Sequence, residues 1–103
     1  MSLLYDAHKL PCFSQWKNTT AVVDGYVTGI EPGTNFPNPR TYEGAQGRVL
    51  ELAGGARTTL GLGVEWHRDA ASVSAAEMAV AKMKAGRATK VYPEPQKGWC
   101  DDA

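Results

Sequence analysis

The sequence lacks an excess of either charge, since its 103 residues include 11 basic and 11 acidic side chains. Affinity for nucleic acid comes largely from neutralising phosphates, so a neutral chain without a basic cluster predicts no nucleic-acid partner. The sequence also lacks an apolar run long enough to span a membrane. Its first residues have neither the charged nor the long apolar region of a secretion signal. We therefore expect no membrane association.

Cysteine is scarce, and motifs that hold metals or nucleotides are missing. Cys12 and Cys100 are far apart in the sequence and form no C-x-x-C pair, which favours reduced thiols in a cytoplasmic protein. His8 and His67 stand apart from each other and from carboxylates at metal-ligand spacing, so we expect no metal. No glycine signature for nucleotides and no nucleophile-elbow motif occurs, so we expect no cofactor.

Glycine and proline are well represented, with 11 and 6 residues, and they indicate many turns between short strands. Residues 10–17 predict a strand in which Cys12, Ser14 and Trp16 share one face. Residues 26–31 predict a second strand, with the Asp24-Gly25 pair as the turn signal before it.

The clearest strand pattern lies in residues 58–67, where apolar and other residues alternate. The apolar members of this alternation are Leu60, Leu62, Val64 and Trp66. Such a period of two predicts a strand with one buried face. We expect it to form a hairpin with a strand at residues 48–52, joined by a glycine-containing turn at residues 53–56.

The periodicity changes to that of a helix after this strand. Ser74 and Glu77 fit a capping box, and Gly86 is a suitable stop, so we predict one helix at residues 74–85. Residues 87–103 predict an extended arm that Tyr92 and Trp99 anchor to the body or to a neighbouring chain. We thus expect a single domain over residues 1–103, with its core at about 10–67.

The segment most informative about function is the predicted strand end at Glu31 and the loop after it. Residues 32–40 contain three prolines, which exclude a helix or a central strand and predict a rigid loop. Trp16 and Lys17 lie on the preceding strand. Aromatic faces pack against sugar rings, and amides such as that of Asn35 bond hydroxyls. Taken singly, Glu31 also fits a solvated edge residue and Trp16 a core residue.

The sequence IEPGTNFP at residues 30–37 resembles a segment near the C-terminus of aldose 1-epimerases, in the uncharacterised galactose mutarotase-like branch. In that family a glutamate ends a strand before an Asn-Phe-Pro-like element. Residues 10–18 are similar to the family's preceding strand, and residues 47–55 and 58–67 to its next strand, turn and closing strand. The resemblance covers about residues 10–84 and is most specific in the Glu31 loop.

The resemblance implies a mainly β fold, an antiparallel β-sandwich portion of a galactose mutarotase-like supersandwich with one C-terminal helix. It implies a small-molecule sugar substrate and interconversion of anomers by general acid–base catalysis, with Glu31 as the catalytic base. The residues then expected to bind the sugar are Trp16, Lys17, Thr34, Asn35 and Arg40.

The chain departs from that family in two respects. Family members are several times longer, and neither His8 nor His67 matches the position of the histidine that acts as the acid. We therefore expect incomplete catalysis, with the missing half supplied by an N-terminal region or a partner chain. Two alternatives remain open, namely a non-catalytic carbohydrate-binding module and a homo-oligomer formed because a half-sandwich leaves open strand edges.

Overall fold

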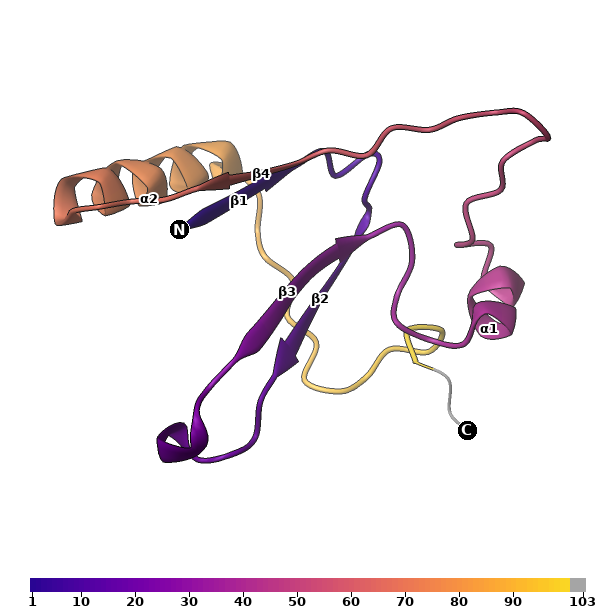
Figure 1. Cartoon of the computed structure of the whole chain (residues 1–103), viewed down its shortest axis with the longest axis horizontal. Helices are drawn as coiled ribbons and strands as arrows, with labels where there is room; N and C mark the ends of the chain where they lie inside the picture. The colour runs from indigo at the N-terminus through magenta and orange to yellow at the C-terminus, as the bar shows by residue number, and fades with distance from the viewer. Residues whose placement is uncertain (101–103) are drawn as a thin grey trace.

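The structure is a computed structural model that describes residues 1–100. It contains two separate two-stranded antiparallel sheets, one 3-10 turn and two helices. The elements in chain order are β1 (Ser2–Tyr5), β2 (Cys12–Lys17), η1 (Val22–Asp24), β3 (Thr28–Gly33), α1 (Arg40–Ala45), β4 (Leu62–Glu65) and α2 (Ala70–Lys84). Figure 1 shows the β2–β3 hairpin projecting away from the β1–β4 pair and α2. The antiparallel strands and the C-terminal helix that the sequence predicted are present, and they form a small mixed α/β structure of two two-stranded sheets.

The β2–β3 hairpin confirms the two strands predicted around the Asp24-Gly25 turn. Gly25 has φ +86°, a conformation that favours glycine. The second strand is shifted by two residues and runs through Pro32, which pairs with Phe13. Proline is tolerated there because a two-stranded sheet has only edge strands, so its missing N–H leaves no inner partner unpaired. The irregular loop therefore starts after Gly33.

The predicted pairing of residues 48–52 with residues 58–67 is wrong. The turn itself forms, since the Ala56 amide donates to the Ala53 carbonyl at 2.9 Å, but no strand precedes it. Instead β4 pairs with β1, and the register places Leu3 opposite Val64. A turn signal predicts only that the chain reverses, and the short strand at the N-terminus supplies the actual partner.

The predicted buried face of the closing strand is also exposed. Leu60, Leu62, Val64 and Trp66 are between 44% and 78% exposed. The buried apolar side chains of the described part of the chain are only Leu10 and Cys12. The alternation correctly indicated a strand, but no other element of the described chain covers its apolar side.

The long helix α2 begins four residues earlier than predicted. Its N-cap is Asp69, whose carboxylate accepts a hydrogen bond from the Ser72 amide at 2.8 Å, while the Asp69 amide donates to the Ser72 hydroxyl at 3.3 Å. This capping box replaces the one predicted at Ser74 and Glu77. Within residues 1–100, neither α2 nor any other helix has the length and apolar character needed to cross a membrane.

Trp99 anchors the C-terminal arm to the body, as predicted, whereas Tyr92 contacts Trp99 within the arm. The rings of Tyr92 and Trp99 meet edge to face with centroids 5.3 Å apart, and Trp99 also contacts Phe36 at 6.1 Å. The Tyr42 hydroxyl of α1 donates to the Cys100 carbonyl. The arm therefore closes over the loop that follows β3; the last part of the predicted arm, residues 101–103, lies outside the described residues.

Substitutions at Asp69 and Ser74 distinguish the capping box at Asp69 from the capping box that the sequence predicted at Ser74. We expect Asp69→Ala to lower amide protection in the first turn of α2 by roughly fivefold, because the Ser72 N–H group loses its acceptor. Hydrogen exchange followed by mass spectrometry measures this change. Ser74→Ala is the matched control and should leave protection there unaltered; an equal loss in both variants would contradict the assignment.

Candidate functional site

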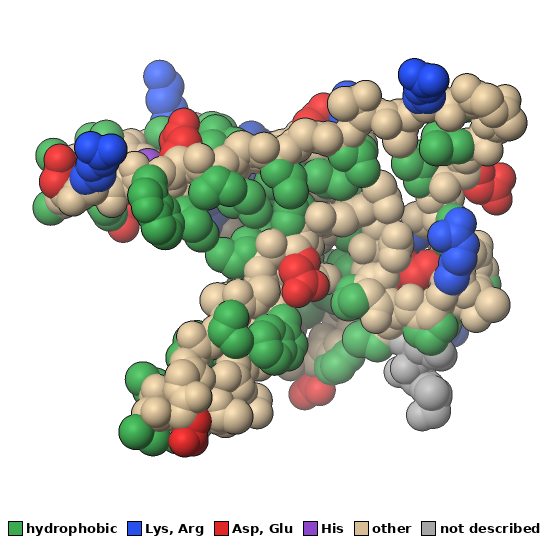
Figure 2. Space-filling view, viewed as in Figure 1, with side chains coloured by type: hydrophobic (Ala, Val, Ile, Leu, Met, Phe, Trp, Pro, Cys, Tyr) green, Lys and Arg blue, Asp and Glu red, His purple; other side chains and the backbone are tan. Residues whose placement is uncertain are grey.

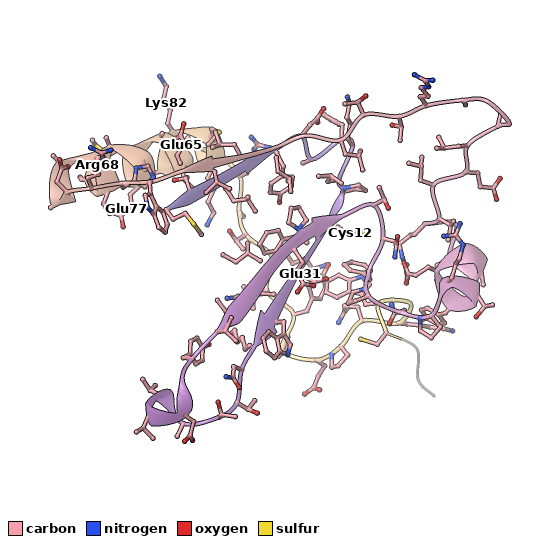
Figure 3. The ribbon with its side chains drawn as sticks, viewed as in Figure 1. Cys12, Glu31, Glu65, Arg68, Glu77 and Lys82 are labelled. Atoms are coloured by element: carbon pink, nitrogen blue, oxygen red, sulfur yellow. The ribbon has the colours of Figure 1, made fainter. Side chains whose placement is uncertain are left out.

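The register of β2 and β3 places three residues of the candidate site on one face of the hairpin. Ser14 lies opposite Glu31, and Trp16 lies opposite Gly29. Because alternate residues of a strand point to the same side, Glu31, Ser14 and Trp16 share a face. Figure 3 shows Glu31 along β3, with Cys12 at the start of the neighbouring strand.

The Glu31 side chain folds back over Gly29. A Cβ atom at position 29 would lie 2.3 Å from Glu31 Oε1 and 3.3 Å from the Cβ of Trp16. The absence of a side chain at Gly29 therefore makes room for the carboxylate next to Trp16. Glu31 is exposed, and no group of residues 1–100 forms a hydrogen bond or ion pair with its side-chain carboxylate.

Trp16 and Lys17, the other candidate residues on the hairpin, lie on opposite faces of it. Trp16 is 53% exposed, so it is not a core residue and its indole is accessible. Lys17 pairs with Thr28 on the opposite face from Glu31. The structure thus brings Trp16 and Glu31 together and places Lys17 away from them.

The loop after β3 borders a cavity of about 410 Å³. Its lining comes from the β1–β2 connection, the loop, and the segment after α1, and consists of His8, Lys9, Pro11, Cys12, Thr34, Gly47, Arg48, Val49 and Leu50. Thr34 is the predicted sugar-binding residue that lines it. Glu31 is not among the lining residues, although its strand ends there.

Two further candidates have mainly local roles. Asn35 accepts a hydrogen bond from the Thr34 hydroxyl at 3.2 Å and donates to the Phe36 carbonyl at 2.7 Å, so its amide shapes the loop. Arg40 is the first residue of α1, is exposed and does not line the cavity. The sequence pattern, which treated residues 32–40 as one loop, missed this helix.

The two histidines lie in different places. His8 borders the cavity next to Thr34. His67 contacts the Ser2 hydroxyl through Nε2 at 2.7 Å, in a separate groove along α2. In the part of the chain that the structure describes, no three histidine, cysteine, aspartate or glutamate side chains are grouped to hold a metal ion.

A comparison with known protein families matches one family model to the part of the chain that holds most of these elements. Residues 1–66 match the family model described as a domain of unknown function, DUF4432. The chain belongs to the DUF4432 family. No curated protein and no solved structure matches it. The DUF4432 portion contains all four strands, α1 and Glu31, whereas α2 and the C-terminal arm follow it.

The DUF4432 portion also contains a buried ion pair around Glu43 of α1, which the sequence pattern did not predict. This side chain is fully buried, with 0% exposed. Arg48 donates to both carboxylate oxygens, through Nε at 2.7 Å and Nη2 at 2.6 Å. The Phe36 amide and the Asn38 side chain donate two more hydrogen bonds at 3.1 and 2.7 Å. We call these four residues the Glu43 clamp.

The Glu43 clamp fixes the loop that follows the Glu31 strand. Asn38 joins it to the C-terminal arm by donating to the Trp99 carbonyl at 2.9 Å, and the Arg48 guanidinium lies 5.1 Å from the centre of the Phe36 ring. The sequence offers one signal for it, since a carboxylate and an arginine five residues apart follow a proline-rich loop. That spacing matches no helix-face pattern, so it does not by itself predict a buried pair.

Hydrogen bonding within the clamp sets its protonation states. The hydrogen bonds from Arg48, followed by those from Asn38 and Phe36, hold the pKa of Glu43 at about 2, below its ordinary value of 4.5, against the opposing effect of burial. The same contact raises the pKa of Arg48. Burial raises the pKa of the neighbouring Cys12 thiol, with Arg48 acting in the opposite direction. The clamp is therefore an ion pair at neutral pH, and Cys12 stays a thiol.

The low pKa of Glu43 predicts an acid-dependent loss of stability. A folded-state pKa below the unfolded one stabilises the fold fully above about pH 4.5, and this contribution is lost as the pH falls toward about 2. We expect Glu43→Gln to lower the thermal midpoint at neutral pH by roughly 10 °C and to flatten the decline in that pH window. Thermal unfolding followed by circular dichroism measures both effects.

The matched control is Glu51→Gln, which changes an exposed glutamate in the same way. It should retain the wild-type midpoint and pH profile. Equal profiles for wild type and Glu43→Gln would contradict the clamp.

Proposed function

We propose that this DUF4432 protein binds a sugar at the Glu31 face of the β2–β3 hairpin, as a relative of aldose 1-epimerases in which Glu31 is the base. The observation that supports this best is an exposed carboxylate, without a partner among residues 1–100, beside an accessible indole on one face of the hairpin. Trp16 offers an apolar surface for a sugar ring, and Glu31 offers an acceptor for its hydroxyls. The resemblance of residues 30–37 adds the expected chemistry.

Glu31 would act on the anomeric hydroxyl of a bound aldose. It takes the proton from that hydroxyl while an acid protonates the ring oxygen, and the C1–O5 bond opens to the aldehyde. Rotation about C1–C2 and the reverse proton transfers then close the other anomer. A base for this step must be accessible and near the sugar, and the exposed carboxylate beside Trp16 meets the first requirement.

The proposed reaction also needs a general acid, and within the described chain the site does not place one beside Glu31. His8 borders the cavity at Thr34, whereas Glu31 lies outside that lining. The two groups therefore do not enclose one sugar-sized space in the described chain. We expect sugar binding by this chain to be measurable and its turnover to be weak unless another polypeptide completes the site.

The second candidate function is a carbohydrate-binding module without catalysis. It is favoured by the same observation, because an exposed tryptophan and a polar loop suffice for binding, and only one member of an acid–base pair stands beside Trp16. The two functions differ in what Glu31 does. In an epimerase it determines the rate, and in a binding module it contributes at most affinity.

The deciding experiment measures anomer exchange and binding separately. We expect Glu31→Gln to lower the rate of anomer exchange of D-galactose or D-glucose, followed by NMR exchange spectroscopy, by about 100-fold or more. Trp16→Ala should weaken binding, followed by NMR titration of the amides of the β2–β3 hairpin, in both functions. The matched control Glu51→Gln should alter neither.

Each result has a clear reading. Binding without exchange, unchanged by Glu31→Gln, supports the module. Exchange that persists undiminished in Glu31→Gln excludes Glu31 as the base. An absence of amide shifts with either sugar, together with an absence of exchange, contradicts both functions.

A further inference from the structure

The chain exposes far more surface than a compact protein of its mass. Its accessible area is 8729 Å², whereas a folded monomer of 11.1 kDa is expected to expose ~5,700 Å². Its radius of gyration is 17.1 Å, against about 13 Å for a compact domain of this length. An excess of about 3,000 Å² is more than the ~800 Å² that each partner buries in a standard interface.

Part of the exposed apolar surface forms one continuous area over the β1–β4 sheet and the hairpin. On the β1–β4 sheet, Leu3 lies opposite Val64, and Tyr5 lies opposite Leu62, so these four share a face. The Tyr5 ring stacks on Phe13 at 6.1 Å. This contact continues the area onto the face of the hairpin that holds Phe13 and Ile30. We call it the Val64–Phe13 surface; it is formed by the exposed Phe13, Ile30, Leu62 and Val64 and by the half-buried Leu3 and Tyr5.

The position of α2 leaves this surface uncovered. The groove between α2 and the β1–β4 sheet is lined by Ser2, His67 and Val73, and Ser2 lies on the opposite face of β1 from Leu3. Glu65 pairs with Ser2 and also lies on that opposite face. Figure 2 shows hydrophobic side chains gathered along the β1–β4 sheet and where this sheet meets the hairpin.

We propose that a second copy of this chain covers the Val64–Phe13 surface, in a dimer with a two-fold axis. All six of its side chains are uncharged, so two copies of it face each other without opposing like charges. The chain has 11 basic and 11 acidic residues, so no net charge opposes association. The excess of about 3,000 Å² per chain is enough for the extensive, apolar interfaces of obligate homodimers, in which each partner buries roughly 1,000–2,500 Å² or more.

This arrangement is independent of the proposed sugar site. Phe13 and Ile30 lie on the opposite face of the hairpin from Glu31 and Trp16. A second copy on the Val64–Phe13 surface therefore leaves the Glu31 face open to a ligand. An experiment can therefore contradict the proposed dimer without contradicting the proposed sugar site, and the reverse.

The test is the mass in solution of the whole chain and of two valine variants. We expect wild type to sediment as a dimer and Val64→Lys to weaken dimerisation at least ~tenfold, because a buried lysine in an apolar interface is unpaired. Val23→Lys is the matched control, since Val23 is 91% exposed in the η1 turn, and it should dimerise as wild type does. Sedimentation velocity over a concentration series measures all three.

A second variant keeps the test decisive if Val64→Lys does not fold. Ile30→Lys changes the hairpin part of the same surface, and circular dichroism shows whether either variant has lost structure. A wild-type chain that stays monomeric at every concentration overturns the proposal. So does a dimer that persists unweakened in a folded Val64→Lys or Ile30→Lys variant.

Discussion

The described structure depends on one buried carboxylate more than on an apolar core. Only Leu10 and Cys12 are buried apolar residues in residues 1–100, so hydrophobic burial within the chain holds little of it together. Glu43 accepts four hydrogen bonds from Arg48, Asn38 and Phe36. Because an unpaired buried charge is costly, these donors are required wherever Glu43 is buried. The clamp thereby joins α1, the loop after β3 and the following segment.

The clamp also determines where the candidate site can be. The loop that it fixes begins one residue after the strand of Glu31, and Thr34 of that loop lines the cavity beside Cys12 and Arg48. The C-terminal arm adds Trp99 to the same loop, although it lies outside residues 1–66 of the DUF4432 match. The strand that holds Glu31 therefore leads directly into a stiff loop, as a binding site on a β scaffold requires.

How far the sequence predicted this structure depends on whether a feature is local. The β2–β3 hairpin and the anchoring of Trp99 were predictable because a turn signal and aromatic side chains act nearby or generically. The partner of β4 was not, since this strand pairing joins residues that are 57 to 63 positions apart in the chain. The buried role of Glu43 was missed because a charged residue in a short helix is usually solvated. The exposed Leu62 and Val64 show that alternation indicates a face suited to burial without indicating what buries it.

The ionisation of Glu43 shows directly whether its carboxylate is held as a buried ion pair. Carbon-13 NMR of the side-chain carboxyl, assigned by its loss in Glu43→Gln, follows this group through an acid titration. We expect a midpoint at about pH 2 while the chain stays folded, with the Phe36 amide shifting in parallel. A midpoint near the ordinary value of 4.5 in the folded chain, with the Phe36 amide unaffected, would contradict it.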